Sequence, residues 1–214
     1  MANNCRAQQL LVVGAGGHAS VVIDVARSAG FEPVAALDPA SVGSKCNGIE
    51  VVGGDEMAHS LFADGLRQCV VAIGDNRLRL KLSERFRAVG FNLPLISHPS
   101  AVISPSARIG DGTVVMPLAV INAGAIIGRT VVVNSAAVIE HDCDIGDGAH
   151  VAPGSRLGGT VSVGICTLVG IGSVVRPNAR IGDYAIIGAG STVISDVQDF
   201  AVAVGCPAKA RNPA

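Results

Sequence analysis

The sequence predicts two halves: an N-terminal half of alternating strands and helices around a parallel sheet, and a C-terminal half that winds as a parallel β-helix. Three observations predict this α/β and β-helix fold class. Apolar and amphipathic runs alternate from Gln9 to about Pro94, a glycine-rich turn follows the first apolar run, and a period of six residues begins at Ile103. We therefore expect two domains, residues 1–95 and residues 96–214.

The first half is expected to contain four strands and three helices. QLLVVGAG reads as a strand ending in glycines, and HASVVIDVARSAG as a helix closed by Gly30. EPVAALD, IEVVGG and CVVAIGDN read as strands, and DEMAHSLFADG as a helix. NRLRLKLSERFRAVG begins with strand-like alternation, but Leu78, Leu82 and Phe86 share one helical face, so we expect a helix. Its basic residues are expected to form a solvated face rather than a phosphate clamp: Arg77, Arg79, Lys81, Arg85 and Arg87.

The second half is built from six-residue blocks. Sixteen consecutive blocks, from ISPSAR to VISDVQ, open with Ile, Leu or Val. The fifth slot is Ala, Ser, Thr or Val in fifteen of them, with Cys143 as the exception, and the second slot is Gly in eight. A period of six fits neither an α-helix nor a series of hairpins, which indicates a repeat architecture. Three blocks would make one triangular coil, with aliphatic first slots inside and second-slot glycines permitting unusual backbone angles.

Composition excludes several classes of protein. A net charge of -1 gives no basic field for nucleic acid, and no Trp with one Tyr leaves few platforms for base stacking. Apolar runs are all interrupted before about 18 residues, so no membrane span is expected. Residues 1–16 read as the first strand rather than a signal peptide. The six cysteines contain no CxxC pair, which favours reduced thiols in the cytoplasm.

The stretch VIEHDCDIGDGAHV, residues 138–151, concentrates polar side chains on the repeat. His141 occupies a third slot, and one coil later the same column holds Gly159. This leaves space above an imidazole, so we interpret His141 as a general base with Asp142 as its acidic partner. A solvated histidine is the alternative. The backbone N–H of Gly159 is a candidate oxyanion donor. His150 should lie on a different face, so one pocket could use both histidines only if neighbouring subunits supply them.

A candidate nucleotide site follows the first strand. Gly14, Gly16 and Ala19 approximate GxGxxG between a strand and a helix, and Asp38 ends the next strand. Three or four strands make half of a dinucleotide fold, so a nucleotide sugar fits better than NAD. A tight strand-to-helix turn, with His18 as an ordinary first-turn residue, is the alternative.

The sixteen blocks resemble the hexapeptide-repeat acyltransferases, which implies a left-handed β-helix. VVGAGGHASVVIDVA followed by ALD, together with IEHDCDIGDGAHVAPGS, is similar to the nucleotide-amino-sugar and sialic acid acetyltransferases, in which a Rossmann-like domain precedes the β-helix. The resemblance implies acetyl-CoA as cosubstrate, no metal, and homotrimers with active sites between subunits. It identifies His141 as the base, Asp142 as its partner (some relatives carry Glu), and the following binding residues. The acetyl-CoA residues are His150, Gly159, Ile171, Ala189 and Lys209; those for the sugar nucleotide are Gly16, Gly17, His18 and Asp38, with Gly14 in the turn.

We therefore expect an acetyl-CoA-dependent N-acetyltransferase that acts on a nucleotide-linked 4-amino-4,6-dideoxy sugar for surface-polysaccharide or glycan biosynthesis. The GDP-perosamine enzymes are one branch of this family that the sequence resembles. Three alternatives remain: an O-acetyltransferase for a sialic-acid-type sugar, a zinc enzyme on the same scaffold, and a nucleotide-binding protein without chemistry. Two smaller questions also stay open. Asn134 reads as a residue that tolerates a left-handed turn, with a role in the site as the alternative. Lys209 reads as either a coenzyme A contact or a surface lysine.

Overall fold

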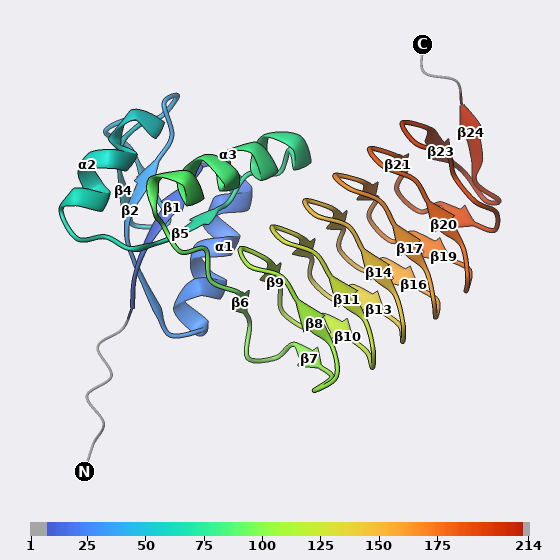
Figure 1. The fold of residues 1–214 in the computed structure, drawn as a ribbon. Coiled ribbons are helices and arrows are strands. Elements are labelled where there is room, and N and C mark those ends of the chain that lie inside the picture. Colours follow the sequence, from blue (N-terminus) through green and yellow to red (C-terminus); the bar gives the residue numbers. More distant parts are fainter. Residues whose placement is uncertain (1–7, 212–214) are drawn as a thin grey trace. The chain divides into compact units, whose positions relative to one another are not determined.

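A computed structural model describes residues 8–211, which divide into two compact units (Figure 1). The first comprises residues up to 74 together with 81–94, and the second comprises residues 75–80 together with those from 95 onward. The expectations for residues 1–7, including Cys5, lie outside the described part of the chain. Within residues 8–211, no helix is both long and apolar enough to cross a bilayer.

The first unit is built on a five-stranded sheet in the order β3-β4-β2-β1-β5. Strands β1 (Gln8–Val13), β2 (Phe31–Leu37), β4 (Ile49–Gly53) and β5 (Gln68–Val71) are parallel neighbours, as predicted, and their apolar runs are largely buried. Helices α1 (Gly17–Ser28), α2 (Ala58–Ala63) after the 3-10 turn η1 (Asp55–Met57), and α3 (Asn76–Val89) confirm the three predicted helices. Strand β3 (Lys45–Cys46) was not predicted; it pairs antiparallel with β4.

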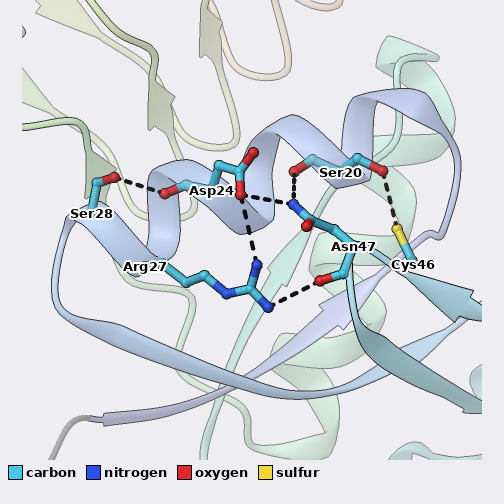
Figure 2. Close-up of polar contacts among 6 residues, drawn as sticks. All are labelled: Ser20, Asp24, Arg27, Ser28, Cys46 and Asn47. Carbon is cyan, nitrogen blue, oxygen red and sulfur yellow. Dashed lines mark hydrogen bonds and ion pairs between the residues drawn. The ribbon is translucent and has the colours of Figure 1, made fainter.

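The β3–β4 hairpin turns at Asn47 and Gly48, whose φ angles of 46° and 82° fit a two-residue primed turn. Figure 2 shows this turn against α1. Asn47 Nδ2 donates to the Ser20 carbonyl (2.9 Å) and to Asp24 Oδ1 (2.8 Å), and Arg27 Nη2 donates to the Asn47 carbonyl (3.0 Å). The Asn-Gly dipeptide was the sequence signal for this extra strand.

Helix α3 departs from the expected pattern of exposure. Leu82 and Phe86 are buried as predicted, but Leu78 is exposed. Arg79 corrects the prediction of a fully solvated basic face, because only 1% of its surface is accessible. Its Nε donates to the Thr130 carbonyl (3.1 Å) and its Nη2 to the Gly148 carbonyl (2.7 Å), both at corners of the repeat. Burial lowers the pKa of Arg79 to about 10, so the guanidinium is still a cation at neutral pH.

The second unit is the predicted parallel β-helix, whose stacked coils are visible in Figure 1. Its short strands form three sheets, and consecutive strands of one sheet are 18 residues apart from β6 to β22. We name the sheets by their lowest-numbered regular strand. The β7 face contains β7 (Val102–Ile103), β10 (Val120–Ile121), β13 (Val138–Ile139), β16 (Arg156–Leu157), β19 (Val174–Val175) and β22 (Thr192–Val193). The β8 face contains β8 (Arg108–Ile109), β11 (Ile126–Ile127), β14 (Asp144–Ile145), β17 (Ser162–Val163) and β20 (Arg180–Ile181).

The β9 face contains β9 (Val114–Val115), β12 (Val132–Val133), β15 (His150–Val151), β18 (Leu168–Val169) and β21 (Ile186–Ile187). It is extended at one end by β6 (Ile96–Ser97) and at the other by β23 (Val202–Val204) and β24 (Lys209–Arg211), which pair antiparallel. First-slot and fifth-slot side chains fill the interior; Ile139, Cys143 and Ile145 each expose 1% of their surface or less.

The second-slot glycines have a different role from the one predicted. The left-handed residues are those of the fourth slot, such as Asp142 (φ 57°) and Gly148 (φ 67°), whereas none of the second-slot glycines has a positive φ. A Cβ on Gly146 would lie 2.7 Å from the backbone nitrogen of Ile165 in the next coil. The second slot therefore requires glycine wherever successive coils approach this closely, and not because of its backbone angle.

Candidate active site

The fourth-slot residues divide the β-helix into three edges, which we name after one member each. The Asp142 edge joins the β7 and β8 faces, the Cys166 edge joins the β8 and β9 faces, and the Gly172 edge joins the β9 and β7 faces. The members of the Asp142 edge are Gly124, Asp142, Thr160 and Asn178. Those of the Cys166 edge are Gly112, Thr130, Gly148, Cys166 and Tyr184, and those of the Gly172 edge are Leu118, Ala136, Gly154, Gly172 and Gly190.

His141 and Asp142 lie together on the Asp142 edge, directly after β13. His141 Nδ1 is 2.9 Å from Asp142 Oδ2, and both side chains are mostly exposed. A Cβ on Gly124, one coil before, would collide with Asp142 Oδ1. The glycine below Asp142 therefore leaves the room that its carboxylate uses to reach the imidazole. With Nδ1 held as a donor to the carboxylate, Nε2 is the nitrogen that can accept a proton.

Gly159 lies over His141, as the spacing predicted. A Cβ on Gly159 would be 2.5 Å from His141 Nε2, so the imidazole packs against this buried glycine in the space that a side chain would fill. The backbone N–H of Gly159 has no acceptor within residues 8–211, although its carbonyl accepts from the Asn178 N–H (3.0 Å). An N–H without a partner beside an imidazole is a donor that a bound carbonyl oxygen can use.

His150 opens β15 and lies on the β9 face, so the single chain does place the two histidines on different faces. Its Nε2 is 2.9 Å from Asn134 Nδ2, and the Asn134 amide oxygen accepts from the Ser135 N–H (2.8 Å). Because that oxygen is engaged, Nδ2 must be the donor and His150 Nε2 the acceptor. Asn134 has no positive φ, which corrects its interpretation as a turn residue. The signal for its contact was the spacing of 16 residues to His150, nearly one coil.

Two further predicted residues stack beside the Gly172 edge. Ile171 and Ala189 are successive third-slot residues; both are exposed, and the Gly190 N–H donates to the Ile171 carbonyl (2.7 Å). Ile171 leaves 60% of its surface accessible, so its aliphatic side chain is available to a ligand. Lys209 lies in β24 and is exposed. These residues belong to the same side of the β-helix as His150, whereas His141, Asp142 and Gly159 belong to the Asp142 edge.

The predicted sugar-nucleotide residues gather at the carboxyl edge of the sheet in the first unit. Gly14 follows β1 with a φ of 107°, and a Cβ there would lie 2.8 Å from the Ala72 carbonyl oxygen after β5. Asp38 follows β2 and accepts from the Ala15 N–H through Oδ2 and from the Ala40 N–H through Oδ1, both at 3.0 Å. Asp38 therefore also orders the glycine turn, a role that the sequence did not indicate.

The N-terminus of α1 is open to a ligand. Gly16 caps it without a side-chain hydrogen bond, Gly17 opens the helix, and a Cβ on either glycine would meet nothing within 4 Å. The first turn carries no acidic residue, and His18 is partly buried in it. This arrangement suits a diphosphate, because the helix N-terminus offers backbone N–H groups and partial positive charge. Among residues 8–211, no group of three or more His, Cys, Asp or Glu side chains is placed to hold a metal ion.

Comparison with known proteins finds a matching family for each half of the chain. Residues 9–86 match the PglD N-terminal domain family, and residues 124–159 match the bacterial transferase hexapeptide family of six repeats. GDP-perosamine N-acetyltransferase of Escherichia coli O157:H7 is 31% identical over 107 residues, which cover 50% of this chain and 48% of that protein. The chain spans about half the length of the curated relatives it matches.

Solved structures match nearly the whole length of the chain. A His-to-Asn variant of perosamine N-acetyltransferase from Caulobacter crescentus, in complex with CoA and GDP-perosamine, superposes with a TM-score of 0.94 at 42% identity, covering 96% of this chain and 97% of that one. The acetyltransferase domain of PglB from Neisseria gonorrhoeae FA1090, in complex with acetyl coenzyme A, has a TM-score of 0.90 at 37% identity and covers 96% and 100%. The chain thus belongs to the hexapeptide-repeat nucleotide-amino-sugar N-acetyltransferases, a family that joins a Rossmann-like half-domain to a left-handed β-helix.

Proposed function

We propose that the protein transfers the acetyl group of acetyl-CoA to the 4-amino group of a nucleotide-linked 4-amino-4,6-dideoxy sugar, with GDP-perosamine as the first candidate substrate. The observation that carries this proposal is the largely exposed His141–Asp142 pair, whose imidazole packs against the backbone of Gly159. The GDP-perosamine bound in the Caulobacter crescentus relative supports the choice of nucleotide sugar.

In this proposal the neutral amine attacks the thioester carbonyl while His141 Nε2 takes the proton that the nitrogen loses. Asp142 holds Nδ1–H and stabilises the imidazolium that forms. The Gly159 N–H donates to the oxyanion of the tetrahedral intermediate. Collapse of the intermediate breaks the carbon–sulfur bond, and the imidazolium returns its proton to the departing coenzyme A thiolate. The products are the acetamido sugar nucleotide and free coenzyme A.

Acetyl-CoA would lie along the side of the β-helix that carries His150, Ile171 and Ala189, with Lys209 near its phosphates. Exposed Ile171 offers an apolar contact, and Lys209 a cation, which suit the two ends of the cofactor. His150, fixed by Asn134, would orient the thioester end.

The nucleotide would occupy the carboxyl edge of the first unit. Its diphosphate would lie at the α1 N-terminus against Gly16, Gly17 and His18, where glycine allows close approach. Asp38 would contact the ribose or base while it holds the turn that follows Gly14.

We further propose a cytoplasmic homotrimer whose acetylated product supplies the synthesis of a surface glycan. Support for the trimer comes from the separation of the two histidines, because one chain cannot present His141 and His150 to the same ligand from different faces. The five cysteines of the described residues are free thiols, in keeping with a reducing compartment.

The test is thiol release from acetyl-CoA with a panel of GDP-, UDP- and dTDP-linked 4-amino sugars. We expect one amino sugar to support release by the wild type and His141→Ala to reduce the rate by about 100-fold or more. His59→Ala is the matched control, since His59 is an exposed histidine of α2 outside the proposed site. Release with a hydroxylated sugar alone would establish O-acetylation instead, and nucleotide binding without release would contradict catalysis.

A further inference from the structure

We infer that Cys143 is a positioning residue that orients the peptide bond whose N–H serves as the oxyanion donor. This inference rests on the proposed function. Cys143 lies directly after Asp142, points inward, and exposes 1% of its surface. Its Sγ donates to the Gly158 carbonyl at 3.2 Å. The Gly158 carbonyl and the Gly159 N–H belong to one peptide unit, so a hydrogen bond to the oxygen acts on the plane that carries the donor.

The contact belongs to a recurrent pattern in the β-helix. In each case a polar fifth-slot side chain donates to the carbonyl of the second-slot glycine 15 residues later. The four hydroxyl examples are Thr113 to Gly128 (2.9 Å), Ser155 to Gly170 (2.7 Å), Thr167 to Gly182 (2.6 Å) and Ser173 to Gly188 (2.9 Å). Cys143 is the thiol member of this set, and it occupies the coil that carries His141.

The fold does not require such a donor at every coil. Val131 stands 15 residues before Gly146 and has no donor to offer, yet that coil is as regular as the others. A coil can therefore form without this side-chain hydrogen bond, so the bond at Gly158 is not needed for the fold. Burial raises the pKa of the Cys143 thiol, which keeps the proton that the hydrogen bond needs.

The third-slot N–H of Gly159 differs from those of neighbouring coils in having no side chain, within the described part of the chain, to accept its hydrogen bond. The third-slot N–H of Arg129 donates to Asp147 Oδ1 (2.7 Å) and that of Ile165 to Asp183 Oδ1 (2.8 Å), so carboxylates already fix these groups. Gly159 has no such acceptor within residues 8–211, and the next residue of its column is Pro177. The hydrogen bond from Cys143 is then the polar contact that holds this peptide from its carbonyl side. It also polarises the peptide, which strengthens the N–H as a donor.

The experiment compares Cys143→Ala, which removes the donor, with Cys143→Ser, which keeps one in a slot where serine occurs elsewhere. We expect Cys143→Ala to lower kcat by about 3- to 10-fold with little change in either KM, because the contact acts on the transition state. Cys143→Ser should restore kcat to within about twofold of the wild type. Thr113→Val, which removes the equivalent bond to Gly128, is the control for lost stability and should leave kcat unchanged.

A readout independent of activity is the carbonyl 13C shift of Gly158. With 13C-carbonyl and 15N glycine, the only doubly labelled peptides are Gly16–Gly17, Gly53–Gly54 and Gly158–Gly159, and substitutions in the first two pairs assign the third. The Gly158 shift should move in Cys143→Ala and return in Cys143→Ser.

Wild-type kcat in Cys143→Ala, an inactive Cys143→Ser that folds normally, or a Gly158 shift unmoved by Cys143→Ala would each overturn the inference. If the wild type released no thiol with any amino sugar, the proposed function would fail on its own. The carbonyl shift would still decide whether Cys143 controls this peptide.

Discussion

Asp142 Oδ2 lies 2.9 Å from Nδ1 of His141, in a pair whose side chains remain 59% and 65% accessible for His141 and Asp142 respectively. An exposed hydrogen bond of this kind contributes little to folding, since water solvates both partners. The contact therefore matters for the tautomer and orientation of the imidazole rather than for the free energy of unfolding.

Asp142→Asn should reduce kcat by about 10- to 100-fold and leave the melting temperature within error, because the amide cannot stabilise the imidazolium. Steady-state kinetics and thermal unfolding of the same samples provide the measurement. Asp144→Asn is the control, since Asp144 is an exposed acid on the outward face of β14, two residues away. Equal losses in the two variants would assign the effect to general charge rather than to the contact.

Alanine substitutions at the adjacent residues Gly158 and Gly159 should have opposite effects: one should lower mainly stability and the other mainly kcat. A Cβ on Gly159 meets the imidazole of exposed His141, which can rotate away, so Gly159→Ala should cost about 100-fold in kcat and little stability. A Cβ on Gly158 meets Pro177 at 2.7 Å from its backbone nitrogen, so Gly158→Ala should lower the free energy of unfolding by about 1–3 kcal/mol. Denaturant unfolding and kcat of both variants test this. Parallel losses in the two quantities would count against the distinction.

Arg79→Met should destabilise the protein by about 3 kcal/mol, because it leaves buried carbonyls of two coils without their donor. Urea unfolding measures the change. Arg77→Met is the matched control on the same helix: Arg77 is exposed, although its guanidinium lies 4.6 Å from the centroid of the Tyr184 ring, and a loss of at most about 1 kcal/mol is expected. Similar losses in both would show that Arg79 behaves as a surface residue.

Stability should fall at alkaline pH because of Cys69. Burial raises the pKa of this thiol from 9.0 to about 12 in the folded protein. Because the pKa is higher in the folded than in the unfolded protein, the protonated Cys69 thiol makes its full contribution to the free energy of unfolding below pH 9. That contribution is lost as the pH rises towards 12, at up to about 1.4 kcal/mol per pH unit. Cys69→Ala should flatten the fall of unfolding free energy between pH 9 and 11. Cys206→Ala, at an exposed cysteine, should leave the slope unchanged.

Mixed trimers should show that two subunits complete each site. His141→Ala and His150→Ala subunits, each inactive alone, should regain roughly a quarter of wild-type activity when co-refolded in equal amounts, because some interfaces then combine both intact histidines. Each variant refolded alone is the control. Absence of recovery in trimers verified by light scattering would place the two histidines in separate roles.

The repeat period predicted the β-helix and the column that joins His141 to Gly159, since an inserted residue anywhere would have broken the sixteen blocks. Other features depend on contacts between segments that no local pattern encodes. Arg79 reads as one of five basic residues on α3, and nothing local indicates that it is buried with its guanidinium donating to the carbonyls of Thr130 and Gly148. Asn134 likewise reads as a turn residue until His150 is placed beside it. The sequence shows that glycine recurs in the second slot. The reason, which is the close approach of successive coils, can be seen only in the folded structure.

The distribution of those glycines has a consequence for how such enzymes change. On the Cys166 edge every second slot is glycine: Gly110, Gly128, Gly146, Gly164 and Gly182. The other two edges admit Met116, Asn134, Ala152, Asn122, Glu140 and Arg176 in the same slot. One edge is thus closed to new side chains in this slot, while two remain open to them. Directed evolution towards another acceptor or acyl donor should therefore find its productive substitutions along the Asp142 and Gly172 edges and almost none along the third.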